Sequence, residues 1–201
     1  VPEWPQDKLA YAQALHAMRC FDAPSVSEED RRRASLYAAE RERQSVRQSV
    51  GSIDGWIESL EMTVRIERLN DANFERTLQL LNKTNQMNLA TRRLAEPELR
   101  DWCAGEGRHL WTFRVSDKFG DAGLCGIASS EVRGREASVA DFLLSCRVMG
   151  RRVEEAMLWH LIRHAAAQGL QRVAFAYRPT PKNKPCLGFL QRSGLTAGAE
   201  N

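Results

Sequence analysis

The fold of this chain can be worked out from one stretch, Asp141-Phe142-Leu143-Leu144-Ser145-Cys146-Arg147-Val148-Met149-Gly150-Arg151-Arg152-Val153-Glu154-Glu155-Ala156. Residues 142–146 form a short apolar run, which is typical of a strand covered on both faces. Residues 147–152 then bring together three arginines and one glycine at the start of a long helix. A helix N-terminus carries unpaired N–H groups and partial positive charge, so it attracts phosphate. The stretch therefore predicts an anion-binding loop between a buried strand and a helix.

Cys146 is the one candidate for a catalytic residue. We expect it to share a face of its strand with Phe142 and Leu144, beside a cationic turn that would lower the pKa of its thiol. Such a thiol can accept an acyl group as a thioester. Free cysteine is also among the residues most often buried, and an inert core thiol is the interpretation that we favour.

The spacing Arg147-x-x-Gly150-x-Arg152 resembles the pyrophosphate loop of the GNAT acyltransferases, R/Q-x-x-G-x-G/A. Arg152 departs from that pattern, because the last position is normally small. The resemblance implies that coenzyme A, or the phosphopantetheine thioester of an acyl carrier protein, is bound by Arg147, Val148, Met149, Gly150, Arg151 and Arg152. It also implies two parallel strands that separate and leave a slot, in which the pantetheine arm lies like an added strand.

Two longer strings, Leu143–Arg151 and Asn82–Leu89 followed by Thr91-Arg92-Arg93, resemble the C-terminal half of FkbH-like proteins. Those proteins join a HAD-type domain to a GNAT-like domain and serve polyketide biosynthesis. The resemblance implies two partners, an upstream HAD-type domain in the same parent chain and an acyl carrier protein. It further implies a part in forming glyceryl-carrier protein, with the phosphoryl chemistry in the HAD-type domain.

Composition excludes several classes of protein. The net charge of +3 is too small to indicate nucleic-acid binding, and the basic residues are not interleaved with aromatic ones. No apolar run approaches a membrane span, and the N-terminus does not have the pattern of a signal peptide. The five cysteines are scattered and odd in number, which favours reduced thiols in a cytoplasm over disulfides or a zinc site. We expect no bound metal.

The chain is expected to have two parts. Residues 1–60 read as a helical connector, with a helix over 7–21, a capping box at Ser27–Asp30, a long helix ending near Ser49 and a short helix capped by Ser52. Residues 61–201 are expected to form the GNAT-like domain. Its fold class is α+β, with a mixed and mostly antiparallel sheet flanked by helices.

The amide-rich stretch after the first helix of this domain has two interpretations. Asn and Thr break helices because their side chains compete for backbone hydrogen bonds, so one interpretation is a simple polar turn. Side-chain amides also suit a carbonyl or amide ligand, which makes it a candidate substrate loop. With the family resemblance the two interpretations are even, and the substrate-binding candidates are Asn82, Thr84, Asn85, Gln86 and Asn183.

Residues 183–195 resemble the closing GNAT segment N-x-x-A-x-x-F-Y-x-x-x-G-F, with Asn183, Phe189 and Gly194 matching. Leu190 stands where many acetyltransferases have a tyrosine that protonates the leaving thiolate, and a leucine cannot act as an acid. Three functions therefore compete. They are a thioester-binding domain that helps acyl or glyceryl transfer, a catalytically silent docking module for the carrier protein, and a stand-alone small-molecule N-acetyltransferase. We favour the first.

Overall fold

The computed structural model describes residues 4–18 and 33–198. It separates into two compact units, Val1–Glu40 and Arg41–Asn201, each of which is described by itself. The second unit holds the sheet and the candidate site.

The described part of the first unit contains a 3-10 turn, η1 (Lys8–Ala10), followed by helix α1 (Tyr11–Ala17). Asp7 caps the turn, because its carboxylate accepts a hydrogen bond of 2.9 Å from the N–H two residues further on. The helix predicted over residues 7–21 is therefore shorter, ending at Ala17. The capping box predicted at 27–30 lies outside the described residues.

Helix α3 (Arg33–Ser49) ends where the sequence predicts, and α4 (Ile53–Ser59) follows it. The predicted cap of α4 is confirmed, since the Ser52 hydroxyl accepts a hydrogen bond of 3.1 Å from the Gly55 N–H.

The compact unit begins at Arg41, earlier than the boundary expected at residue 61. The reason is burial, because three side chains of the expected connector belong to this unit's interior. Arg43 is 3% exposed, and Trp56 and Leu60 are buried as well. The role of this segment as a link to an upstream domain stays a prediction.

Six strands within the described residues form one sheet, with the order β1-β3-β4-β5-β2 and with β6 also paired to β5. Their bounds are β1 Thr63–Arg68, β2 Met87–Asn88, β3 Arg108–Asp117, β4 Gly120–Arg133, β5 Glu136–Leu144 and β6 Arg172–Phe175. Every pair is antiparallel except β5–β6, which is parallel and connected through a helix. The predicted mixed, mostly antiparallel sheet is confirmed.

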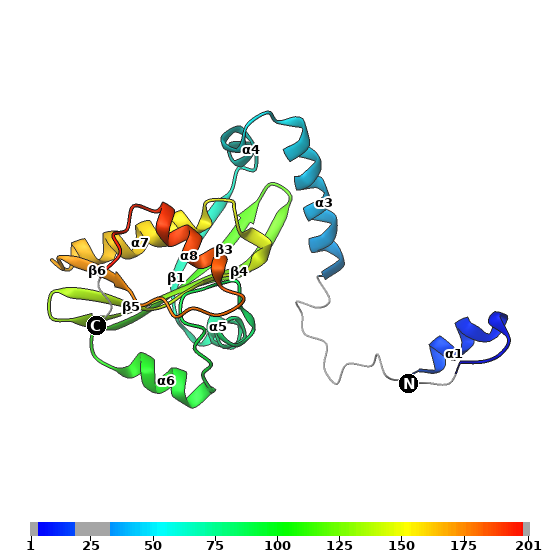
Figure 1. Cartoon of the computed structure of the whole chain (residues 1–201), viewed down its shortest axis with the longest axis horizontal. Coiled ribbons are helices and arrows are strands. Elements are labelled where there is room, and N and C mark those ends of the chain that lie inside the picture. Colours follow the sequence, from blue (N-terminus) through cyan, green and yellow to red (C-terminus); the bar gives the residue numbers. More distant parts are fainter. Residues whose placement is uncertain (1–3, 19–32, 199–201) are drawn as a thin grey trace. The chain divides into compact units, whose positions relative to one another are not determined.

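Helices cover both faces of the sheet (Figure 1). α5 (Asp71–Lys83) and α6 (Glu96–Ala104) lie on one face, and α7 (Val153–Ala167) and α8 (Lys184–Arg192) on the other. Within the described residues, no helix has both the length and the apolar character needed to cross a bilayer.

A hydrophobic core lies on each face of the sheet, and the side chains of the apolar run of β5 alternate between these two cores. Phe142 and Leu144 belong to the core under α7 and α8, whereas Leu143 belongs to the core under α5 and α6. All three are fully buried. Because successive side chains of a strand point to opposite faces, a continuous apolar run is what a strand between two helical layers requires.

β5 and β6 separate after four residue pairs. They pair from Glu136 with Arg172 to Val139 with Phe175, and β6 then ends. Beyond that point β2 lies beside β5, with Asn88 opposite Leu143. The end of β5 therefore has a strand on each side, β4 and β2.

Candidate functional site

The loop between β5 and α7 has buried anchors and two backbone positions in the left-handed region. Val148, in the 3-10 turn η2 (Cys146–Val148), is fully buried. Gly150 has φ +74° and Arg152 has φ +60°. Glycine adopts such angles freely, whereas an arginine is strained by them. Arg152, the residue that departs from the loop pattern, is thus also the strained N-cap of α7.

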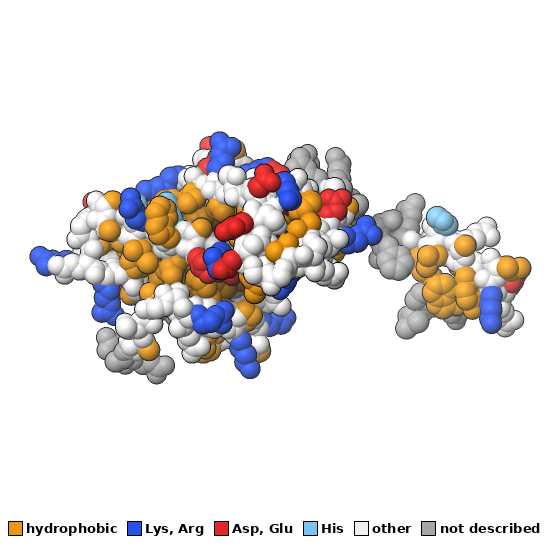
Figure 2. Space-filling model, turned by 90° about the horizontal axis from the view of Figure 1, so that it is seen from above, with side chains coloured by type: hydrophobic (Ala, Val, Ile, Leu, Met, Phe, Trp, Pro, Cys, Tyr) orange, Lys and Arg blue, Asp and Glu red, His pale blue; other side chains and the backbone are white. Residues whose placement is uncertain are grey.

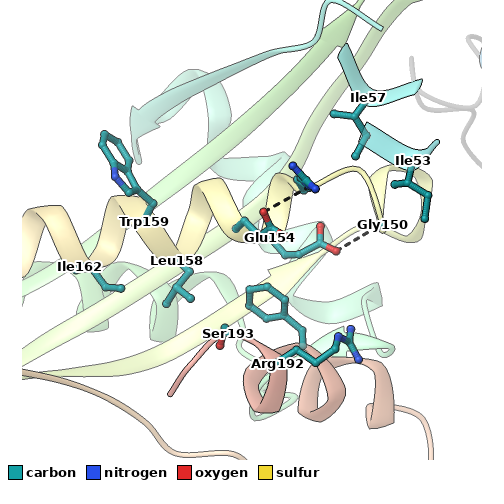
Figure 3. Close-up of a pocket in the computed structure, with 12 residues that line it drawn as sticks. Ile53, Ile57, Gly150, Glu154, Leu158, Trp159, Ile162, Arg192 and Ser193 are labelled. Atoms are coloured by element: carbon teal, nitrogen blue, oxygen red, sulfur yellow. Dashed lines mark hydrogen bonds and ion pairs between the residues drawn. The ribbon is translucent and has the colours of Figure 1, made fainter. Parts of the chain in front are cut away.

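A cavity of about 540 Å³ opens on this loop (Figure 3). Its walls come from α4, the loop, α7 and α8, and they are mostly apolar with a few charged groups. The lining residues are Ile53, Ile57, Gly150, Arg152, Glu154, Glu155, Leu158, Trp159, Ile162, Phe189, Arg192 and Ser193.

The outer face of the cavity region is unusually apolar. Trp159 and Ile53 are each 60% exposed and Ile162 is 44% exposed. Figure 2 shows apolar side chains gathered on this side of the molecule, with acidic side chains between them. Sequence reasoning missed these residues, although apolar positions beyond the buried stripe of a helix are a visible signal.

The carboxylate of Glu154 accepts the hydrogen bond that the Gly150 N–H of the loop would otherwise donate to a bound anion. The Gly150 N–H donates a hydrogen bond of 3.1 Å to Oε1 of Glu154 (Figure 3). The other oxygen, Oε2, is buried and has no hydrogen-bond partner among the described residues. From its place in the first turn of α7, this glutamate would be expected only to interact favourably with the helix dipole. Its position four residues after a loop glycine is the signal that it can reach back over the first turn.

The three arginines of the loop differ in burial and in the groups that they contact. Arg151 is 3% exposed, and its Nη1 lies 3.6 Å from Oδ2 of Asp117. Arg152 is exposed and pairs with Asp54. Arg147 is half-buried, and burial lowers the pKa of its guanidinium.

Of the six loop residues predicted to bind the cofactor, the cavity is lined by Gly150 and Arg152. Val148 and Arg151 are buried, so any contact that they make with a ligand runs through their backbone. The pattern of arginines alone could not reveal this, because the inward turn of Arg151 depends on Asp117, on the β3–β4 hairpin.

Cys146 is exposed, and it lies in η2 after the end of β5. The expected inert core thiol is therefore wrong, since the strand stops at Leu144 and does not carry the cysteine inward. Among the described cysteines, Cys125 and Cys186 are buried, and burial raises the pKa of each thiol to about 12. A catalytic role for Cys146 stays a prediction.

The amide-rich stretch is mainly tied to its own backbone. Asn82 lies in α5, and its Nδ2 donates to the carbonyls of Leu78 at 3.1 Å and Leu94 at 2.9 Å. Thr84 is the C-cap of α5, and Asn85 accepts a hydrogen bond from Arg93. Gln86 is exposed. These are the internal bonds of a polar turn, and a substrate-binding role for the group stays a prediction.

Asn183 is fully buried, and its side chain is used within the protein. Its Oδ1 accepts hydrogen bonds of 2.7 Å from the Tyr177 hydroxyl and from the Thr180 N–H. Its Nδ2 donates to the carbonyls of Asn88 at 3.0 Å and Arg178 at 2.9 Å. An amide side chain has two acceptor and two donor positions, so these four bonds leave it nothing for a ligand.

Arg92 does not form a solvated face or an open anion site. Its guanidinium makes a two-pronged ion pair with Asp141, which is 2% exposed, and its Nε lies 3.0 Å from Oδ1 of that carboxylate. Ser129 donates its hydroxyl to the same carboxylate at 2.5 Å. This network ties the chain after β2 to the centre of the sheet.

The rings of His160 and His164 pack against aromatic side chains of β3. The ring of His164 lies edge-on against Trp111 at 4.6 Å and against His109 at 4.8 Å. Burial lowers the pKa of all three histidines, and that of His164 falls to about 4. Among the described residues, no cluster of histidine, cysteine, aspartate and glutamate has an arrangement suited to a metal ion.

No protein-family model matches the chain. No curated protein matches it in sequence either.

Solved structures do match the fold. A Trypanosoma brucei acetyltransferase aligns with TM-score 0.51 and 16% identity, over 69% of this chain and 96% of that one. The ribosomal-protein-S18-alanine N-acetyltransferase of Escherichia coli aligns with TM-score 0.51 and 12% identity, over 68% and 80%. AAC(6')-Iy, solved with the bisubstrate analog CoA-S-monomethyl-acetylneamine, aligns with TM-score 0.51 and 14% identity, over 69% and 95%.

At such low identity these structures establish the fold alone. The fold they match is a mixed sheet flanked by helices, which in this chain includes the parallel pair β5–β6 on either side of α7. The chain has the α+β fold of the GNAT acyltransferases.

Proposed function

We propose that this domain binds the phosphopantetheine thioester of an acyl carrier protein, or of coenzyme A. On the FkbH-like resemblance, its parent protein forms glyceryl-carrier protein for polyketide biosynthesis, with a HAD-type domain upstream. The cytoplasm is the compartment proposed for it.

One observation carries the proposal. The loop of residues 147–152 precedes α7, turns at Gly150 with φ +74°, and opens on the cavity between α7 and α8. A Cβ built at Gly150 meets nothing within 4 Å, so the space over its backbone is open. Backbone amides at a helix start are suited to phosphate, and the apolar walls suit the rest of a large ligand.

A docking module without chemistry is the second candidate. Leu190 is buried in the core under α7 and α8, so no acid stands at this position of α8. The carboxylate of Glu154 also lies where a phosphate would accept the Gly150 N–H. Both observations favour a fold kept for binding a protein partner.

The test is calorimetric titration of the chain with coenzyme A, and with an acyl carrier protein in its apo and holo forms. Gly150→Val places a β-branched residue at a left-handed position in the loop, and it should weaken coenzyme A binding by at least about tenfold. Gly134→Val is the matched control, since Gly134 has φ +60° and open space around its Cβ, in the turn between β4 and β5.

Holo carrier protein binding that exceeds apo binding, and that Gly150→Val abolishes, would support a thioester site. Equal binding of apo and holo forms, with no effect of Gly150→Val, would support docking instead. Failure to bind either carrier form or coenzyme A would refute the proposal.

A further inference from the structure

The gap between the separating strands β5 and β6 is filled by the chain itself. The Leu89 N–H donates a hydrogen bond of 3.0 Å to the Phe142 carbonyl on β5. On the other side, the Arg178 N–H donates a hydrogen bond of 3.0 Å to the Leu89 carbonyl. Met87, Asn88 and Leu89 are each at most 2% exposed. The segment Met87–Leu89 is thus a strand inserted between two diverging ones.

A side-chain clamp holds the inserted segment. Asn183 joins the carbonyl of Asn88 to that of Arg178, and Tyr177 and Thr180 fix the opposite end of the amide. Since the Asn183 side chain is fully buried, losing it would leave several buried polar groups without partners. The Asn183 amide is therefore a main support of β2 on the side away from β5.

The inserted segment is short and adjoins a strained residue. β2 has two residues, so it adds few ladder bonds of its own. Thr91 has φ +51°, which is unfavourable for a β-branched residue. Its Oγ1 is buried and has no hydrogen-bond partner among the described residues. Release of the segment would relieve this strain and free this hydroxyl, so local opening costs less than it would for a regular strand.

We propose that Met87–Leu89 is an internal occupant of the thioester slot, and that the slot opens when this segment leaves β5. The inference rests on the proposed function, and it adds a mode of regulation to it. The pantetheine arm carries two amide groups, which can pair with a strand edge as a peptide does. The end of β5 offers one free edge at most, because β4 holds the other. The arm and Met87–Leu89 therefore exclude each other.

A self-occupied slot lowers apparent affinity. When only a fraction of molecules is open, the observed dissociation constant rises in inverse proportion to that fraction. Carrier-protein contacts near the loop could shift the equilibrium toward the open form, whereas free coenzyme A lacks such contacts. The closed segment thereby favours a carrier-bound arm over the free cofactor.

The test combines amide hydrogen exchange with calorimetry on the whole chain. Saturation with coenzyme A should remove the protection of the Leu89 and Arg178 amides. Asn183→Ala removes the clamp, and should tighten coenzyme A binding by roughly tenfold. Tyr177→Phe removes one bond to the clamp and should act in the same direction with a smaller effect; it carries the test if Asn183→Ala does not fold. Asn70→Ala is the control, because it also loses a structural amide, the N-cap of α5, away from the slot.

Tighter binding in the clamp variants, with exposed amides in the bound state, would support displacement. Saturable binding with both amides still protected, or weaker binding in the clamp variants, would overturn it and leave the proposed function standing. No binding in any variant, with the clamp variants folded and their slot amides exposed, would overturn both.

Discussion

Asp117 interacts with two buried arginines from distant parts of the chain, and replacing it tests whether this buried ion cluster stabilises the fold. Its carboxylate accepts hydrogen bonds of 2.6 Å and 2.8 Å from Nε and Nη2 of Arg43 on α3. Nη1 of Arg151, in the loop before α7, lies 3.6 Å from it. The three side chains are 2–4% exposed. The end of the connector and the candidate loop thus meet on one carboxylate.

The expected cost of Asp117→Ala follows from this burial. Removing one partner of a buried ion pair costs about 3–5 kcal/mol, because the remaining charge stays out of water. For a chain of this size, each kcal/mol lowers Tm by about 2–4 °C. Asp117→Ala should therefore lower Tm by about 6–20 °C, and urea unfolding should show a matching loss in the free energy of unfolding.

Asp121→Ala is the matched control on the same hairpin. Its carboxylate pairs with Arg114, but these side chains are 39% and 48% exposed, so the loss should stay below about 1 kcal/mol. Asp117→Ala combined with Arg43→Met should be milder than the sum of the single changes, since no charge at position 43 is then left behind. If Asp117→Ala costs no more than Asp121→Ala, the buried ion cluster is not a feature of the folded protein.

Two further predictions concern charge. The pKa of His164 is lowered to about 4 by burial and then by His109 and Arg68, so the unfolded chain binds this proton first as pH falls from 6.5. The free energy of unfolding should fall from pH 6.5 through pH 4, and His164→Gln should make its pH dependence shallower in urea unfolding; an unchanged slope would contradict this. Glu154→Gln keeps an acceptor for the Gly150 N–H but removes a charge from the cavity, so calorimetry should show coenzyme A binding tightened by roughly tenfold at low salt, and weaker binding would contradict this.

Most of the fold could be predicted because its signals are local. Ser52 caps α4 as expected, Asn70 caps α5 through the same kind of side-chain bond, and Gly169 follows α7 with φ +71°. The apolar run 142–144 is a buried strand because two helical layers cover it. Each of these features depends on a few neighbouring residues, and side-chain chemistry at such positions leaves few alternatives.

The parts of the site that sequence reasoning missed depend on distant partners. β2 is two residues long, so it has no periodicity, and it forms because β5 has an edge without a partner. Arg151 turns inward because Asp117 is there to receive it. Cys146 is exposed because β5 ends two residues before it. The apolar run 142–146 predicts a strand that continues to Cys146, and the alternation of side chains then places the thiol in the core.

The two competing functions make different demands on the same edge of β5. A docking module gains from a filled slot, because β2 and the Asn183 clamp complete the sheet and stiffen the surface around it. A thioester-binding domain needs that edge, and would have to undo the clamp in each cycle. The left-handed backbone of Thr91 and its buried hydroxyl, which has no partner among the described residues, both destabilise the closed segment. Neither feature would benefit a segment that stayed permanently in place. They weigh toward a segment that moves, and so toward a site that a carrier-bound arm can enter.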